Sequence, residues 1–291
     1  MVSAAAPGLA ARRGQSLQWD RAALCWWWAG GATGTVQAWS PDGAHELRRV
    51  VAGEAGGFAL CASGRLLVCQ PKRLCFVTVA NTPGTPNTPN TPKAPRGWRL
   101  RSLCAVDPAE PRTSIHEGRT DRRGFFVFGT RNDGVDARPI GSFYQYSSQY
   151  GLRRLALPAV TVATGIGFSV DGRRLYFADG ANKRILQCDY DCETAGVANV
   201  RLFAGTDGFP EACVIDSEDH LWSAQAGAGR LVRYAPDGSV LRQFALPPGA
   251  PASPAFGGVA CDQLMVASWG GLIGFPQAGV TGLHDAPFDD G

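Results

Sequence analysis

The stretch that decides the fold reads His220-Leu221-Trp222-Ser223-Ala224, then Arg230-Leu231-Val232-Arg233-Tyr234, then Pro236-Asp237-Gly238. Each of the first two runs is short and rich in residues that favour strands. The Pro-Asp-Gly sequence after them supplies the residues that a reversing chain needs. The stretch therefore predicts two antiparallel strands followed by a tight turn.

The same unit recurs six times along the chain. We expect the first strand of the unit at residues 23–28, 65–69, 125–129, 174–178, 220–224 and 263–267, and the second at residues 35–39, 74–79, 141–146, 184–189, 230–234 and 271–275. No long window keeps a helical period. A repeat of this length is typical of propeller blades with four strands each. The sequence predicts one all-β domain over residues 1–291, a six-bladed β-propeller; a β-sandwich is the alternative, but it would not predict six copies of one unit.

Composition limits the function. Charged residues make up 18% of the chain, the net charge is +3, and no run of Lys or Arg resembles a nucleic-acid footprint. No segment approaches the roughly 18 uninterrupted apolar residues of a membrane span. The Ala-rich residues 1–13 lack the apolar centre of a signal peptide. We expect a soluble, cytoplasmic protein whose partner is a small-molecule substrate, not nucleic acid or a membrane, with its nine cysteines as buried thiols.

A Thr-Pro repeat interrupts the pattern at about residues 81–97. Each proline fixes its backbone φ angle and removes a hydrogen-bond donor. We expect this stretch to form an extended, exposed insertion between the second and third blades.

Several motifs resemble the SMP-30/gluconolactonase/LRE-like family, in particular its bacterial sugar-acid lactonases. They are Asp121-Arg122-Arg123-Gly124-Phe125-Phe126-Val127-Phe128-Gly129-Thr130, Gly141-Ser142-Phe143-Tyr144, Ile166-Gly167-Phe168-Ser169-Val170-Asp171-Gly172, Leu175-Tyr176-Phe177-Ala178-Asp179 and Val232-Arg233-Tyr234-Ala235-Pro236-Asp237-Gly238. The resemblance implies a six-bladed propeller. It also implies one divalent metal ion at the mouth of the central channel, where the ion polarises a lactone carbonyl.

The family's functional positions are substituted in this chain. The resemblance places its metal ligands, normally Glu, Asn and Asp, at Gln15, Thr164 and Glu211. The family's Arg-x-Asn-Asp-Gly motif, which reaches the substrate, reads Ser114-Ile115-His116-Glu117-Gly118. The surrounding scaffold motifs are intact, which indicates relaxed or changed chemistry on a retained fold.

Two interpretations of the site remain open. In the first, His116, Glu117 and Glu211 are catalytic and form a substitute site for one divalent ion, which is Ca²⁺, Mg²⁺, Mn²⁺, Zn²⁺ or Fe²⁺; Gln15 and Thr164 can each add a neutral oxygen. In the second, no metal binds, and His116 with Glu117 or Glu211 is an acid–base pair or lines a pocket.

The run Trp26-Trp27-Trp28 adds a further alternative. Strand alternation puts Trp26 and Trp28 on one face and Trp27 on the other. These side chains either pack between blades or form an apolar wall of the pocket, and we include Trp28 with Ser114 and His116 among the predicted substrate contacts. The predicted function is the opening of a small sugar-acid lactone. The alternative is a diverged member without metal-dependent hydrolysis, either a binding protein or a catalyst for a more apolar substrate.

Overall fold

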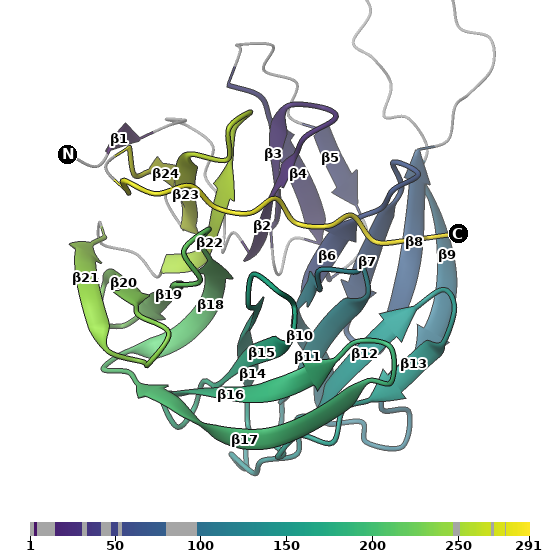
Figure 1. Ribbon diagram of the computed structural model, residues 1–291. Coiled ribbons are helices and arrows are strands. Elements are labelled where there is room, and N and C mark those ends of the chain that lie inside the picture. The colour runs from purple at the N-terminus through teal and green to yellow at the C-terminus, as the bar shows by residue number, and fades with distance from the viewer. Residues whose placement is uncertain are drawn as a thin grey trace, which may run out of the picture.

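The computed structural model describes residues 3–4, 15–30, 34–41, 48–51, 54–79, 98–246, 251–268, 271–276 and 278–291. Within these residues every regular element is a strand, and the strands form six antiparallel sheets of four. The sheets stand in a ring around a central axis (Figure 1). The predicted six-bladed β-propeller is confirmed. The predicted insertion at residues 81–97 lies outside the described residues.

The strands follow one another from the axis outward in each of the first five blades. Blade 1 contains β2 (Gln15–Asp20), β3 (Cys25–Ala29), β4 (Thr35–Trp39) and β5 (Arg48–Val51). Blade 2 contains β6 (Gly57–Leu60), β7 (Leu66–Gln70), β8 (Arg73–Val79) and β9 (Trp98–Ala105). Blade 3 contains β10 (Thr113–Thr120), β11 (Phe126–Asn132), β12 (Phe143–Ser147) and β13 (Gly151–Arg154). Blade 4 contains β14 (Ala163–Phe168), β15 (Arg174–Asp179), β16 (Arg184–Asp191) and β17 (Gly196–Gly205). Blade 5 contains β18 (Phe209–Ile215), β19 (Leu221–Ala226), β20 (Arg230–Tyr234) and β21 (Val240–Ala245).

Blade 6 joins the two ends of the chain. It contains β22 (Pro251–Gly257), β23 (Gln263–Ser268) and β24 (Gly271–Gly274), and its fourth strand is β1 (Ser3–Ala4) from the beginning of the chain. β1 pairs antiparallel with β24. The ring is therefore closed by hydrogen bonds between the first and last strands, so that closure depends on both ends of the sequence.

The two strands predicted in each repeat are the second and third strands of a blade. Their ends differ from the prediction by a few residues. The strand expected from residue 23, for example, begins at Cys25, because Asp20 Oδ1 accepts hydrogen bonds from the main-chain N–H groups of Ala22 (2.9 Å) and Ala23 (3.0 Å). These bonds hold residues 21–24 in a turn.

The core lies between neighbouring blades. Trp26 and Trp28 pack against Leu272 of blade 6, whereas Trp27 packs with Phe58 of blade 2. The expected alternation of the three tryptophans is thus confirmed. Their burial stabilises the packing of blade 1 against both neighbouring blades.

The last residues of the chain, 278–291, cross the end of the ring where the innermost strands finish (Figure 1). Gly282 pairs with Asp216 of blade 5, and Phe288 pairs with Cys61 of blade 2. The Phe288 side chain is fully buried, and Asp290 receives a hydrogen bond from Arg65 Nε at 2.7 Å. We refer to residues 278–291 as the C-terminal strap.

The cysteines behave as the composition suggests. All nine are free thiols, and seven of them are buried. Burial raises the pKa of several of these thiols, including Cys69, Cys188 and Cys213. They therefore act as small apolar side chains of the core.

The described residues form no helix with the length and hydrophobicity of a membrane span.

Candidate active site at the mouth of the channel

The innermost strands of five blades share one irregularity. β2, β10, β14, β18 and β22 each have an extra residue relative to the strand they pair with, and each break in register lies near the start of the strand. Such bulges redirect side chains and are common next to active sites. In β10 the unpaired residue is His116, and in β18 it is Glu211.

These bulges surround a small cavity of about 10 Å³ on the axis. It is lined by residues of four blades, namely Gln15, Ser16, His116, Glu117, Glu211, Ala212 and Ser253. The volume is about that of one water molecule or one ion. Because the innermost strands all run in the same direction, the cavity lies at the end of the channel opposite the C-terminal strap.

A wider cavity of about 180 Å³ opens beside it toward blades 2 and 3. Its lining consists of Gln15, Glu54, Ala55, Gly56, Pro71, Ser114, Ile115, His116, Arg131 and Asp133. Gln15 and His116 line both cavities. We call the wider space the mouth cavity and the narrower one the axial cavity. Together the two cavities form one site, in which a small ligand in the mouth cavity would contact Gln15 and His116.

His116 is buried, and its protonation can be inferred from its neighbour. Its Nδ1 lies 3.2 Å from the main-chain oxygen of Ala163 in blade 4. A carbonyl oxygen only accepts hydrogen bonds, so the neutral ring carries its proton on Nδ1. Nε2 is then the atom with the lone pair, and His116 is suited to accept a proton.

Two carboxylates line the axial cavity. Glu117 Oε2 accepts a hydrogen bond from the N–H of Gly165 at 2.8 Å, while Glu211 comes from the bulge of β18. The pKa of Glu117 is raised from its ordinary 4.5 to about 8, because burial and the charge of Glu211 raise it more than the hydrogen bond from Gly165 and the charge of Arg119 lower it. Two acidic groups in one small space favour a proton or a cation between them.

Ser16 adds an unsatisfied oxygen to the same place. It is only 8% exposed and lines the axial cavity, and its Oγ has no hydrogen-bond partner among the described residues. A buried hydroxyl without a partner is costly, which marks a position where a ligand atom would be favourable. With Glu117, Glu211 and Gln15 it offers a set of hard oxygen donors, and this set fits a divalent cation of the Ca²⁺, Mg²⁺ or Mn²⁺ type.

Thr164 does not join that set. Its side chain is fully buried, it lines neither cavity, and its Oγ1 donates a hydrogen bond to the main-chain oxygen of Pro210 at 2.6 Å. The structure therefore brings two of the three predicted metal positions, Gln15 and Glu211, to the axial cavity and turns the third toward the backbone of blade 5.

Nor does the structure form the three-residue set of His116, Glu117 and Glu211. Among the described residues, three or more His, Cys, Asp or Glu side chains have ligand atoms mutually within 4.8 Å only at Asp216, Glu218 and His220. His116 Nδ1 faces the main-chain oxygen of Ala163, so Nε2 is the ring atom that could bind a metal.

Trp28 also lies away from the site. It is 0% exposed, lies in the core between blades 1 and 6, and lines neither cavity. The inclusion of Trp28 as a substrate contact is a prediction that this placement does not support. Trp26 and Trp27 do not line either cavity as described, whereas Ser114 and His116 do line the mouth cavity.

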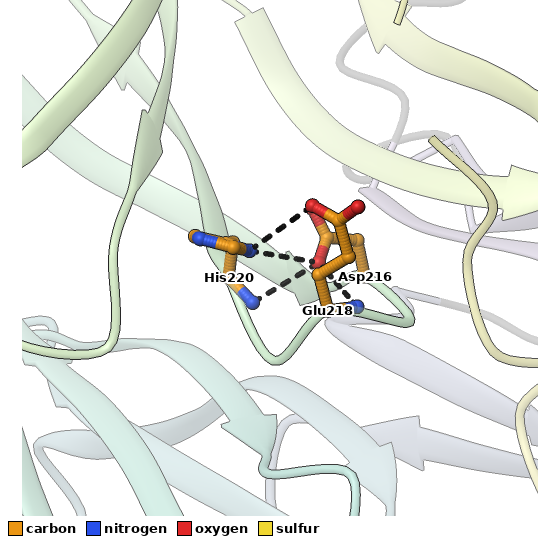
Figure 2. Close-up of side chains that lie close together, drawn as sticks. All are labelled: Asp216, Glu218 and His220. Carbon is orange, nitrogen blue, oxygen red and sulfur yellow. Dashed lines mark hydrogen bonds and ion pairs between the residues drawn. The ribbon is translucent and has the colours of Figure 1, made fainter. Parts of the chain in front are cut away.

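The cluster of Asp216, Glu218 and His220 has a structural role (Figure 2). Asp216 is fully buried at the turn between β18 and β19, and its Oδ1 accepts hydrogen bonds from the N–H groups of Glu218 and His220. Its Oδ2 accepts from Trp222 Nε1 and Arg233 Nε, both at 2.8 Å. Arg233 also pairs with Glu218 through Nη2 at 2.6 Å, so one guanidinium bridges the two carboxylates and stabilises the turn.

Some of the lining residues carry no signal in the sequence. Ser16, Glu54, Arg131, Asp133 and Ser253 reach the two cavities only through the bulges and the register of the strands. Ser16 has a φ angle of 53°, a left-handed conformation that a non-glycine residue rarely adopts. Such a conformation cannot be predicted from a serine in a polar stretch.

A six-bladed propeller with an acidic axial cavity and a polar mouth defines the class of protein. The family described as SMP-30/gluconolactonase/LRE-like region matches residues 13–270, and the chain belongs to this family. It is 41% identical over 167 residues to an L-arabinolactonase of Azospirillum brasilense, covering 56% of this chain and 55% of that protein. It is 36% identical over 115 residues to a pentonolactonase of Haloferax volcanii, covering 38% and 40%. The matched segment thus spans about half the length of these relatives.

Solved structures share the fold. A luciferin-regenerating enzyme superimposes with a TM-score of 0.82 at 20% identity, covering 95% of each chain. A calcium-binding protein named regucalcin from Agrobacterium tumefaciens superimposes with a TM-score of 0.78 at 20% identity, covering 99% of this chain and 96% of that one.

Proposed function

We propose that this protein hydrolyses a small sugar-acid lactone at the mouth cavity. The observation that carries the proposal is the convergence of Gln15, His116, Glu117 and Glu211, from three blades, on one cavity at the channel end. Relatives named for lactonase activity support the reaction class.

The size and polarity of the mouth cavity support the substrate class. Its volume of about 180 Å³ lies below the range typical of sites for drug-sized ligands. Carboxylate, amide, hydroxyl and guanidinium groups line it beside the apolar Ala55, Pro71 and Ile115, so the hydroxyl groups of a compact ligand would find hydrogen-bond partners on its polar side.

The axial donors would hold one divalent cation. Glu117, Glu211, Gln15 and Ser16 supply the oxygens, and a bound cation would polarise the lactone carbonyl and lower the pKa of water. Thr164 has no part in this set, because its hydroxyl is committed to Pro210.

The protein's own groups supply the proton transfers. His116 Nε2 accepts a proton from the water that attacks the carbonyl carbon, and the hydrogen bond between Nδ1 and Ala163 holds the ring in position. When the bond between the carbonyl carbon and the ring oxygen breaks, the same nitrogen returns the proton to that oxygen. The product is the open-chain hydroxy acid, and its carboxylate proton passes to the solvent.

The test is a hydrolysis assay with purified protein and a panel of pentono- and hexonolactones, with EDTA or with added Ca²⁺, Mg²⁺ or Mn²⁺. We expect ring opening that the cation restores after EDTA, and a loss of kcat on the order of 10²-fold or more in His116→Gln and Glu211→Gln. Arg242→Ala, in β21 at the outer edge of blade 5, should leave the rate unchanged. If no cation supports hydrolysis of any lactone in the panel, the proposal is wrong.

A further inference from the structure

Arg131 and Ser114 lie directly opposite one another in the pairing of β11 with β10. Side chains of directly opposed residues in an antiparallel pair point to the same face of the sheet. Both residues line the mouth cavity. The small Ser114 side chain therefore leaves space beside the long Arg131 side chain, on the face that a ligand would contact.

Arg131 is the one Lys or Arg side chain in the lining of the mouth cavity as described. Its Nε donates a hydrogen bond to Asp133 Oδ1 at 2.7 Å. Asp133 is itself held, since its main-chain N–H donates to the oxygen of Arg112 at 2.7 Å. Within the described part of the chain this is the hydrogen bond that the Arg131 side chain makes, so Nε orients the guanidinium while Nη1 and Nη2 remain for a ligand.

A guanidinium held in this way recognises a particular pattern of oxygens. Its planar fork pairs with two adjacent oxygen atoms, which a lysine ammonium cannot match. The other charged groups of the lining, Glu54 and Asp133, are acidic. They accept hydrogen bonds from hydroxyl groups and repel an anionic ligand.

We propose that Arg131 determines substrate specificity by binding two neighbouring oxygens of a neutral, polyhydroxylated lactone. The inference rests on the proposed function, because it names the substrate contact at the same site. Because Ser114 faces Arg131 across the strand pair and lines the same cavity, an arginine at position 114 would also present its guanidinium there.

The experiment compares Arg131→Ala with the wild type on two substrates: a lactone with vicinal hydroxyl groups, and an unsubstituted lactone of the same ring size. We expect KM for the hydroxylated lactone to rise about tenfold or more, the size of a lost charge-assisted hydrogen-bonded pair. We expect kcat on that substrate and both constants on the unsubstituted lactone to stay within about twofold. Arg131→Lys should rescue only part of the loss, and the exchange variant S114R/R131S should recover most of it.

Arg138→Ala is the matched control, because Arg138 lies in the loop that follows β11, pairs with Asp136 and lies outside both cavities. It should leave KM unchanged. Binding of a non-hydrolysable cyclic ether analogue of the hydroxylated lactone, measured by calorimetry, separates this inference from the proposed function. If the wild type binds the analogue, Arg131→Ala weakens the binding and no lactone is hydrolysed, the specificity role stands and the hydrolase proposal falls. If Arg131→Ala leaves KM and analogue binding unchanged, or the wild type does not bind the analogue, the inference is wrong.

Discussion

Glu117 of blade 3 accepts a hydrogen bond from the main-chain N–H of Gly165 in blade 4, at 2.8 Å. The bond crosses from one blade to the next at the level of the axial cavity and fixes a carboxylate beside a second one, Glu211. Gly165 has a φ angle of +61° within the bulge of β14, so the donor is presented by a backbone conformation that suits glycine.

Glu117→Gln should stabilise the cation-free protein at alkaline pH. The pKa of Glu117 is raised by burial from 4.5 to about 8. A group with a raised pKa in the folded state favours folding fully below its unfolded pKa, and this contribution is lost as the pH rises through the folded value. The free energy of unfolding of the wild type should therefore fall between about pH 4.5 and 8. The variant should be more stable by roughly 1–3 kcal/mol at pH 8.5 and nearly equal at pH 5.

Urea melts in EDTA at the two pH values measure this difference. Val135→Ala, a change at an exposed side chain that does not titrate, should alter the free energy of unfolding equally at the two pH values. An equal difference between wild type and Glu117→Gln at pH 5 and pH 8.5 would contradict the assigned cause.

Ser16→Ala separates folding from cation binding. Removing a buried hydroxyl without a partner should leave the free energy of unfolding unchanged or raise it slightly in EDTA. If the same oxygen is a cation ligand, the dissociation constant for Ca²⁺ or Mn²⁺ should rise several-fold, and that for Glu211→Gln should rise more because a charge is lost. Titration calorimetry of the two variants and the wild type reports both values. Unchanged affinity in Ser16→Ala would remove Ser16 from the donor set.

Thr164→Val should have the opposite pattern. The hydroxyl of Thr164 stabilises the fold through its hydrogen bond to Pro210, and its loss should cost about 1 kcal/mol. Cation affinity should stay within a factor of two, since the side chain lines neither cavity. If Thr164→Val greatly weakens cation binding and leaves the free energy of unfolding unchanged, Thr164 is a cation ligand after all.

The C-terminal strap should contribute strongly to stability. Phe288 is fully buried against blades 2 and 3, and Phe288→Ala should lower the free energy of unfolding by about 3 kcal/mol or more. Thermal denaturation measures the effect, and Val135→Ala, at an exposed position, is the control. A shift in Tm as small as that of the control would show that the strap is not part of the cooperative fold.

Asp290→Asn tests the attachment of the strap to blade 2. Burial opposes ionisation of Asp290, but hydrogen bonds from Ser63 and Arg65 outweigh it and hold the pKa below its ordinary value. A lowered pKa contributes stability above the unfolded value, which is lost as the pH falls through the folded one. The variant should therefore lose stability at pH 7 and differ little from the wild type near pH 2. If the free energies of unfolding of wild type and variant differ by the same amount at pH 7 and near pH 2, the charge of Asp290 does not stabilise the strap.

The architecture could be predicted because each repeat carries its own local signals. The turn at Asp237 is an example. Its carboxylate accepts a hydrogen bond from the N–H of Ser239 at 2.9 Å, and Gly238 has a φ angle of 88°. Turn residues of this kind mark the strands on either side of them. The outermost strands carry no such pattern; β17, for example, is largely exposed and has no regular alternation.

The site could be predicted only in part, because it depends on small displacements. Gln15, His116, Glu117 and Glu211 were predicted from their positions in motifs, and all four line the axial cavity. Thr164 comes from an equivalent position, yet its hydroxyl turns to the neighbouring backbone. Arg131 was not predicted at all, since its place in the site follows from the register of β11 against β10.

The C-terminal strap lies across the channel end opposite the mouth cavity. Thr120 Oγ1 donates to the oxygen of Ala286 at 2.6 Å, and Arg119 contacts Asp285 at 3.5 Å, so the strap is anchored to the wall of the channel itself. In the proposed reaction, the substrate and its product would therefore use the same opening. The ring-opened acid would then compete with the next lactone for the mouth cavity. We expect competitive inhibition by the product, so that the rate falls as the acid accumulates.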